Sequence, residues 1–225
     1  MIRLVVFDMD DTLFPEYEFV RSGFEAVADY MEEQFGIEDF FDTAWNKFIE
    51  GERGRIFDQI IDDEGLETDS RTIGKVLEIY RSHYPKISLF KDAQWALEYC
   101  SAFVPLALIS DGYLKTQENK AEALNIERFF QKVYFTDKWG PECWKPSTCA
   151  FEMAEKDFSV LGSECVYVSD NPIKDFIGPN KLGWKSIYIE RKEGVYSGVK
   201  TPHGGEPEVK ISSLYDLKQA LSMRA

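Results

Sequence analysis

The sequence predicts an α/β protein built around a parallel β-sheet that helices cover on both faces. Short apolar runs rich in β-branched residues recur along the chain, and segments with helical periodicity separate them. The runs are continuously apolar instead of alternating, which is typical of strands buried on both faces of a parallel sheet. The five runs lie at 4–7, 104–109, 133–135, 166–168 and 186–189.

The connection after the first run is too long for a simple crossover between parallel strands. Within residues 15–85, four sets of apolar side chains repeat with the spacing of one helix face. We therefore expect a four-helix insertion at 15–85 that folds on itself over the mouth of the sheet, and a core formed by 1–14 and 86–225. The four sets are Val20, Phe24, Val27 and Met31; Phe41, Ala44, Trp45 and Phe48; Ile56, Phe57, Ile60 and Ile61; and Ile73, Val76, Leu77 and Tyr80.

Helices and a loop complete the predicted core. Pro172 follows a strand and the pair Asp170-Asn171, so we expect it to be the first residue of a helix. Residues 192–207 are rich in glycine and proline and predict a surface loop before a last strand and helix. Two further helix faces are indicated by Ala93, Ala96, Leu97 and Cys100, and by Leu214, Leu217 and Leu221.

Composition limits the partners of the protein. The 225 residues include 26 Lys and Arg against 40 Asp and Glu, a formal net charge of −14. This charge repels a phosphate backbone or an anionic surface, so we expect neither nucleic acid nor a membrane as a partner. The apolar stretch at 103–109 is far shorter than the ~20 residues that span a bilayer. The start of the chain reaches Asp8 before the apolar stretch of a signal peptide is complete.

The spacing of the cysteines indicates the cellular compartment of the protein. Cys100, Cys143, Cys149 and Cys165 form neither a C-x-x-C pair nor a metal-binding spacing. We therefore expect free thiols in a reducing cytosol, and a cytoplasmic protein.

Acidic side chains follow the first predicted strand. Asp8 and Asp10 stand at its carboxyl end, where open α/β sheets bind ligands. Because the chain must turn here, both carboxylates can converge on one cation. On its own, this stretch also fits a solvated acidic turn.

Polar groups follow the next three strands as well. Ser110-Asp111-Gly112 offers a hydroxyl and a glycine turn whose N–H groups can face an anion, and Lys145 and Asp170 follow the third and fourth runs. Each motif alone has an ordinary explanation in a turn, a solvated loop or a helix start. Together they place two acids, a hydroxyl, a lysine and a further acid at one sheet edge. A divalent cation and a phosphoryl group require such a set.

These motifs resemble those of the haloacid dehalogenase-like hydrolases, and the resemblance spans nearly the whole chain. It is carried by Asp8-x-Asp10-x-Thr12, Ser110, Lys145, and Asp170-Asn-Pro-x-x-Asp175, and by the helical insertion between the first two motifs. Asp11 stands where the family commonly has glycine, and Pro179 where it commonly has alanine. The resemblance implies a Rossmann-like core, a helical cap at 15–85 and a phosphatase that uses Mg²⁺.

The resemblance also implies a role for each motif. Asp8 would attack phosphorus to give an aspartyl-phosphate, and Asp10 would serve as the general acid and base. Asp8, Asp170 and the backbone carbonyl of Asp10 would bind Mg²⁺. Ser110, the amides from Asp111 onward and Lys145 would hold the phosphoryl group. Asp175 would orient a ligand or water next to the metal, and Thr12 would brace the turn.

Several alternatives remain open at this point. A 2-haloacid dehalogenase of the same family needs no second acid at the position of Asp10, so Asp10 favours phosphate. Phosphonate cleavage would need a Schiff-base lysine from the cap, whose lysines are Lys47 and Lys75. A phosphomutase uses the same first two aspartates. A receiver-type phosphoacceptor has its accepting aspartate on a later strand, and a non-catalytic binding protein would be expected to lack one of the four groups.

The predicted cap indicates the kind of substrate. A cap that closes over the sheet makes a cavity suited to a small phosphorylated metabolite. Residues 208–220 resemble the tail of capped relatives that act on nucleoside monophosphates or acylated sugar acid phosphates. A monomer and a homodimer both remain open. Side chains that could contact substrate are Phe14, Tyr17, Arg21, Arg53 and Arg55.

Overall fold

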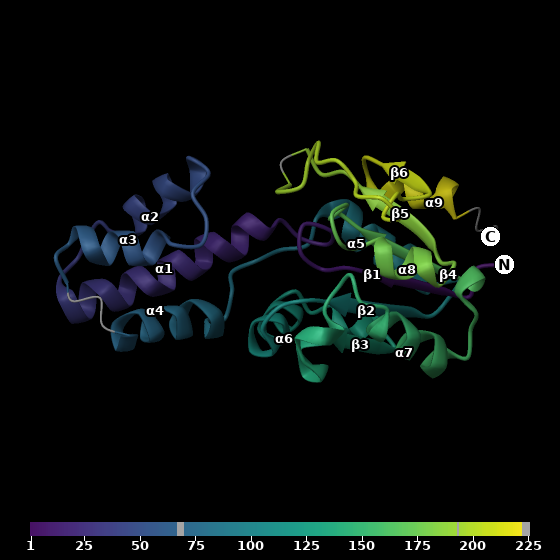
Figure 1. Ribbon diagram of the computed structural model, residues 1–225, viewed down its shortest axis with the longest axis horizontal. Helices are drawn as coiled ribbons and strands as arrows, with labels where there is room; N and C mark the ends of the chain where they lie inside the picture. The colour runs from purple at the N-terminus through teal and green to yellow at the C-terminus, as the bar shows by residue number, and fades with distance from the viewer. Residues whose placement is uncertain (67–69, 193, 222–225) are drawn as a thin grey trace. The chain divides into compact units, whose positions relative to one another are not determined.

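Six short strands pair in parallel to form one sheet in the computed structural model, which describes residues 1–66, 70–192 and 194–221 (Figure 1). The order across the sheet is β3-β2-β1-β4-β5-β6. The predicted fold class, an α/β protein with a Rossmann-like parallel sheet, is therefore confirmed. The strands are β1 (Leu4–Phe7), β2 (Leu106–Ser110), β3 (Lys132–Phe135), β4 (Cys165–Ser169), β5 (Lys185–Ile189) and β6 (Val209–Ile211).

The central strands are buried along their whole length, which explains their continuously apolar sequences. Every residue of β1, β2 and β4 is buried. Alternate residues of a strand point to opposite faces, so burial of all of them means that both faces are covered. On one face, Leu4 and Val6 pack in a cluster with Ala150, Phe151 and Ala154 of α7 (Cys149–Phe158).

The strand order reverses at β1, and this reversal positions the functional site. β1 pairs with β2 on one side and with β4 on the other. Connections therefore leave β1 and β4 toward opposite sides, which opens a crevice at their carboxyl ends. The residues that follow β1 and β4 in the sequence, from Asp8 and from Asp170, lie at this crevice.

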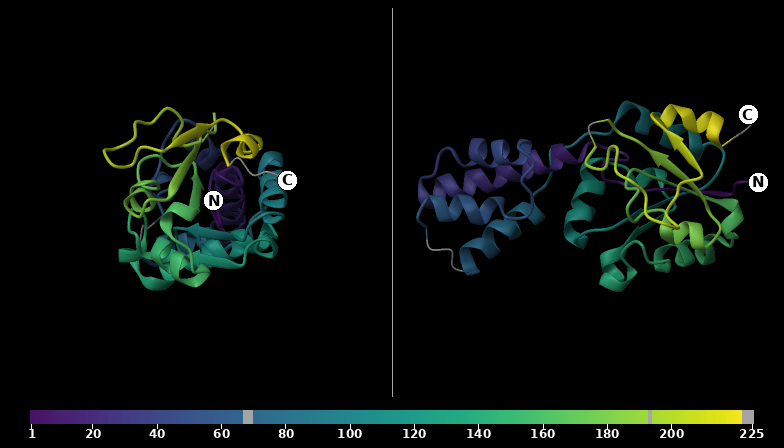
Figure 2. Two further views of the ribbon diagram at one scale, coloured as in Figure 1. Left: turned by 90° about the vertical axis from the view of Figure 1, so that its right-hand side faces the viewer. Right: turned by 45° about the horizontal axis from the view of Figure 1, so that its top comes forward.

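The remaining helices of the core follow their strands. They are α5 (Lys91–Ser101), α6 (Leu114–Ala123), α8 (Ile177–Lys181) and α9 (Leu217–Ala220), and the 3-10 turn η5 (Leu214–Asp216) precedes α9. Figure 2 shows α5 and α9 side by side, in agreement with the contacts that each makes with η5.

The predicted helix start at Pro172 is wrong. Residues 172–176 form turns, and α8 begins only at Ile177. The side-chain oxygen of Asn171 accepts a hydrogen bond from the N–H of Ile173 at 3.0 Å. Asparagine side chains that bond nearby backbone groups favour turns over helices, which delays the helix by one turn.

The insertion after β1 consists of four helices, as the apolar repeats predict. They are α1 (Glu16–Phe35), α2 (Phe40–Ile49), α3 (Ile56–Asp63) and α4 (Ser70–Ser82). Tyr17–Ile87 forms one compact unit, and Met1–Glu16 together with the chain from Ser88 onward forms a second. The helical unit has an apolar cluster of its own, to which Phe24, Met31, Phe40, Ile61 and Val76 contribute.

The cysteines differ from the prediction of free thiols. Cys143 and Cys149 form a disulfide, whereas Cys100 and Cys165 are free and buried. A short 3-10 helix, Pro141–Cys143, and the turn after it bring the two Cα atoms to 5.2 Å, within the range that a disulfide bridges. The six-residue separation carries no familiar motif, so the sequence did not indicate this pair.

Within the described residues, no helix is both long and apolar enough to cross a bilayer.

Candidate active site

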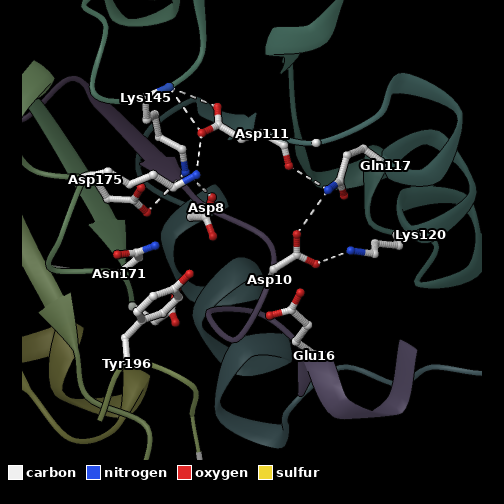
Figure 3. A pocket seen from close by; sticks show the side chains of 13 residues that line it. Asp8, Asp10, Glu16, Asp111, Gln117, Lys120, Lys145, Asn171, Asp175 and Tyr196 are labelled. Atoms are coloured by element: carbon white, nitrogen blue, oxygen red, sulfur yellow. Dashed lines mark hydrogen bonds and ion pairs between the residues drawn. The ribbon is translucent and has the colours of Figure 1, made fainter. Parts of the chain in front are cut away.

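A polar cavity lies at the carboxyl ends of the strands, and every residue that lines it belongs to the core unit (Figure 3). Six predicted site residues meet there: Asp8, Asp10, Asp111, Lys145, Asp170 and Asp175. The cavity is also lined by Gly112, which belongs to the glycine turn expected to face an anion. Its other lining residues have no role predicted from the sequence: Glu16, Gln117, Lys120, Asn171, Lys174 and Tyr196.

Lys145 links two of the carboxylates. Its Nζ donates to Asp8 Oδ1 at 2.6 Å, to Asp175 Oδ2 at 3.2 Å and to the hydroxyl of Tyr167 at 3.0 Å. The ammonium group is buried, which opposes its charge, but Asp175 and Asp8 raise the pKa of Lys145 well above its usual value. Ser169 Oγ also donates to Asp175. Lys145 is thus held as a cation against Asp8, 137 positions away in the sequence.

The carboxylates near Lys145 form a cluster suited to a divalent cation. Asp8, Asp170 and Asp175 are buried, and one oxygen from each lies within 4.8 Å of the others. Burial, and then the charges of Asp175 and Asp10, raise the pKa of Asp8 to about 7. Burial and the charge of Asp8 raise the pKa of Asp170 well above its usual value. Clustered carboxylate oxygens are the ligands that Mg²⁺ prefers, and a bound cation would relieve this repulsion, so the residues fit a magnesium site.

The sequence predicts that Asp8, Asp170 and the backbone carbonyl of Asp10 bind the metal. The carboxylate of Asp175 joins those of Asp8 and Asp170 in the cluster. Thr12 lies fully buried in the turn after β1 and donates through Oγ1 to Asp170 Oδ1 at 3.4 Å, which ties this turn to the residue after β4.

Asp10 is bound from the side by helix α6. Lys120 Nζ donates to Asp10 Oδ1 at 2.6 Å, and Gln117 Nε2 donates to Asp10 Oδ2 at 3.1 Å. The two donors are three residues apart, so they lie on the same face of α6. Both of them are buried. Neither residue could be predicted from the sequence, because a lysine and a glutamine in a polar helix look like solvated side chains.

Ser110 and Asp111 follow β2 and have different surroundings. The Ser110 hydroxyl is buried and has no hydrogen-bond partner among the described residues, and Ser110 is not among the residues that line the cavity. The Asp111 carboxylate accepts from Thr136 Oγ1 at 2.8 Å, from the backbone N–H of Lys145 at 3.2 Å and from Lys174 Nζ at 2.6 Å. Burial would raise the pKa of Asp111, but the charges of Lys145 and Lys174 lower it.

Glu16 and Tyr196 line the cavity beside the aspartates. Burial, and then the charge of Asp10, raise the pKa of Glu16 to about 7. Burial, and then the charge of Glu16, raise the pKa of Tyr196 to about 12. Tyr196 lies in the glycine-rich loop predicted at 192–207, and its backbone oxygen accepts from the hydroxyl of Tyr188 at 3.2 Å. A tyrosine in a loop and a glutamate at a helix start carry no sequence signal for a site.

The five predicted substrate-contacting residues are not among those that line this cavity. Phe14 is fully buried, and Lys120 Nζ lies 5.7 Å from the centre of its ring. Tyr17 is exposed at the start of the helical unit.

The three arginines bond within the helical unit itself. Arg21 Nε lies 3.6 Å from Glu25, and Arg55 lies 3.9 Å from Asp58. Arg53 donates to the backbone oxygens of Phe48 and Glu52.

Comparison with known proteins identifies the family. A family model described as haloacid dehalogenase-like hydrolase matches residues 5–189. An (S)-2-haloacid dehalogenase from a Pseudomonas species is 29% identical over 142 residues, which are 63% of this chain and 59% of that protein. A glyceraldehyde 3-phosphate phosphatase from Methanocaldococcus jannaschii is 28% identical over 200 residues, 84% of this chain and 85% of that protein.

The fold agrees with solved structures of the same family. A hydrolase from Bacillus subtilis that was crystallised with magnesium superposes with a TM-score of 0.68 at 16% identity, over 99% of both chains. At that identity the likeness concerns the fold alone. The family match covers most of the chain, including most of β1, the two aspartates that follow it, β2, β4 and β5. The chain belongs to the haloacid dehalogenase-like hydrolases and is an enzyme of that family.

Proposed function

We propose that the enzyme is a Mg²⁺-dependent phosphatase that hydrolyses a small phosphorylated metabolite through an aspartyl-phosphate on Asp8. The observation that carries the proposal is the second carboxylate of the cavity. Asp10 lines the same cavity as Asp8, and Lys120 and Gln117 bind both of its oxygens. A phosphoryl transfer with an alcohol leaving group needs such an acid, whereas attack on carbon with halide departure does not.

In the first step, Asp8 attacks phosphorus. One carboxylate oxygen forms the new bond to phosphorus while the bond from phosphorus to the ester oxygen breaks. Lys145 donates to Asp8 Oδ1 and so fixes the direction of the attacking group. Asp10 gives a proton to the leaving alkoxide, which departs as the alcohol.

In the second step, water attacks the phosphorus of the aspartyl-phosphate. Asp10, now deprotonated, accepts a proton from this water, and Asp8 leaves as a free carboxylate. Lys120 and Gln117 keep the Asp10 carboxyl oriented in both steps. The unpartnered hydroxyl of Ser110 offers a donor for a phosphoryl oxygen.

The carboxylate cluster explains the expected dependence on Mg²⁺. A cation held by Asp8 and Asp170, with Asp175 beside them, would neutralise charge on the phosphoryl oxygens and on the nucleophile. Without it, an anionic substrate would approach a group of buried carboxylates.

Haloacid dehalogenation is the second candidate, because one relative carries that activity in its name. It would use Asp8 as a nucleophile on carbon and leave Asp10 without a role. The paired binding of Asp10 by α6 favours the phosphatase.

A phosphate-release assay tests the proposal. The native chain and Asp8→Asn would be compared with and without Mg²⁺, on glyceraldehyde 3-phosphate, glycerol 3-phosphate, a nucleoside monophosphate and p-nitrophenyl phosphate. We expect Mg²⁺-dependent release that falls by about a thousandfold or more in Asp8→Asn, because the covalent route is lost. The exposed Asp42→Asn serves as the control and should not change the rate.

Three results would contradict the proposal. Equal release by Asp8→Asn would remove Asp8 from its role. Chloride release from 2-chloropropionate without any phosphate release would assign the dehalogenase reaction. Transfer of the phosphoryl group to a sugar, with no free phosphate, would assign a mutase.

A further inference from the structure

We propose that Glu16 selects phosphate esters whose leaving alcohol carries neutral hydroxyl groups and disfavours those whose alcohol carries a carboxylate. This inference rests on the proposed phosphatase function and names the substrate class of the same cavity.

The backbone holds Glu16 firmly at the cavity. Glu16 is the first residue of α1, and its N–H donates to Asp11 Oδ1 at 2.8 Å. Asp11 itself has a left-handed backbone, with a φ of 49°, and its other oxygen accepts from the N–H of Val195 at 3.2 Å. Asp11 thus ties the start of α1 to the loop that carries Tyr196. The position where the family commonly has glycine therefore has a structural function in this chain.

The side chain of Glu16 points into the cavity, toward Asp10. Figure 3 shows its carboxylate directed into the cavity beside that of Asp10. The carboxylate forms no hydrogen bond or ion pair with any residue that the structure describes. A half-buried polar group of this kind is left to bind something that enters the cavity.

The proposed reaction places the leaving alcohol against Glu16. Asp10 protonates the ester oxygen, so this oxygen faces Asp10 and the carbon atoms attached to it extend past Asp10. Glu16 lies next to Asp10 (Figure 3), and we infer that the alcohol extends along it. A hydroxyl group on the alcohol can donate to Glu16, whereas a carboxylate there would meet a like charge.

No lysine of the cavity is left over to receive a substrate carboxylate. Each of the three that line it is already bonded to an aspartate: Lys145 to Asp8, Lys174 to Asp111 and Lys120 to Asp10. Acidic residues at the cavity number six, twice the lysines. A single bound Mg²⁺ would be occupied with the phosphoryl group, so no cation of the cavity is left to pair with a substrate carboxylate.

Two esters of the same length test the inference. Glycerol 3-phosphate and 3-phosphoglycerate differ in a terminal hydroxymethyl group against a carboxylate. At pH 8, above the raised pKa of Glu16, we expect the native enzyme to favour glycerol 3-phosphate in kcat/KM. Glu16→Gln should reduce this preference at least about tenfold, mainly through a lower KM for 3-phosphoglycerate. Glu32→Gln, an exposed change on the same helix, is the control and should keep the native ratio.

A binding measurement separates this inference from the phosphatase proposal. Calorimetric dissociation constants of both esters with Mg²⁺ would be compared between Asp8→Asn and the double variant Asp8→Asn with Glu16→Gln. If the ratio of the two dissociation constants falls about tenfold in the double variant, selection by Glu16 is supported. This holds even if the native chain releases no phosphate and the phosphatase proposal fails. An unchanged ratio in both assays, or an equal loss for both esters, would overturn the inference. Failure of glycerol 3-phosphate to bind would also overturn it.

Discussion

The ammonium group of Lys145 is the cation on which the buried carboxylates depend. It lies 2.6 Å from Asp8 and 3.2 Å from Asp175, and its side chain is 3% exposed. Removing one partner of a buried ion pair leaves the other charge buried without compensation, which costs about 3–5 kcal/mol. Loss of the Lys145 ammonium group would leave two buried carboxylates, Asp8 and Asp175, without their partner.

We therefore expect Lys145→Met to lower the free energy of unfolding by about 3–5 kcal/mol at pH 8 without Mg²⁺. Lys132→Met is the matched control: Lys132 lies 3.4 Å from Asp157, its side chain is 53% exposed, and its loss should cost less than about 1 kcal/mol. Urea unfolding of both variants measures the difference. Similar losses in the two would show that the buried position of Lys145 carries no special weight.

At the scale of elements, Asp92 joins segments that are far apart in the sequence. Its carboxylate accepts from Arg191 at 2.7 and 3.1 Å, from Ser213 Oγ at 3.0 Å and from the N–H of Leu214 at 2.9 Å. Arg191 also donates to the backbone oxygen of Thr12 at 2.8 Å, in the turn that carries Asp10. The start of α5, the end of β5 and the turn before η5 thus meet at one carboxylate and support the turn that carries Asp10.

This network predicts a pH-dependent stability. Burial would raise the pKa of Asp92, but hydrogen bonds from Arg191 and Leu214 hold it below the usual 3.8. The carboxylate therefore stabilises the native chain above pH 3.8, and this contribution is lost as the pH falls through the lowered pKa. Asp92→Asn should cost about 3–5 kcal/mol at pH 7, because it leaves Arg191 without its partner.

The cost of Asp92→Asn should shrink progressively below pH 3.8. Guanidinium unfolding of the native chain and the variant between pH 7 and pH 3 measures it. A difference that stays constant across this range would contradict a role for the ionised carboxylate.

Substitution of a glycine tests how closely two segments of the chain pack. A methyl group at Gly162 would overlap the backbone oxygen of Leu182, which cannot move aside without shifting the chain after α8. We expect Gly162→Ala to destabilise the protein by about 2–4 kcal/mol, as for other strained core changes.

The control for Gly162 is Gly74 in α4. A methyl group there would meet nothing within 4 Å. Gly74→Ala should stabilise the protein by about 0.5–1 kcal/mol, because alanine favours the helix. Thermal unfolding of both variants gives the comparison, and a loss at Gly74 or none at Gly162 would contradict this description of the packing.

At the scale of the whole molecule, the two compact units have separate apolar cores. One core packs the sheet against α7, and the other lies among α1 to α4. The carboxylate cluster belongs entirely to the first unit. A ligand stabilises the elements that bind it and those that unfold together with them.

We therefore expect millimolar Mg²⁺ to slow amide hydrogen exchange in β1, in β4 and in the turns after them, and to leave α2 and α3 nearly unchanged. Asp170→Asn should abolish this effect, because it removes a ligand from the cluster. Peptide-level exchange measured by mass spectrometry tests the expectation. Equal slowing in both units, or slowing that persists in Asp170→Asn, would contradict a cation site at these carboxylates.

Local sequence patterns determined the elements and the chemistry of the acids. The apolar runs predicted β1 and β4 because a strand buried on both faces needs apolar side chains at every position. The repeats in the insertion predicted α1 to α4 because each helix buries one stripe. The acids after β1 and β4 could be expected at one edge, because parallel strands end on the same side of a sheet.

Only the tertiary structure decided how the acids are partnered and what else enters the cavity. Asp10 is bound by Lys120, 110 positions away, and no pattern around either residue predicts that pairing. Glu16 and Tyr196 reach the cavity because Asp11 ties a helix start to a distant loop. Cys143 and Cys149 meet because a short 3-10 helix turns the chain back. Secondary structure follows from local periodicity, whereas these contacts depend on the path of the backbone between distant segments, which periodicity does not specify.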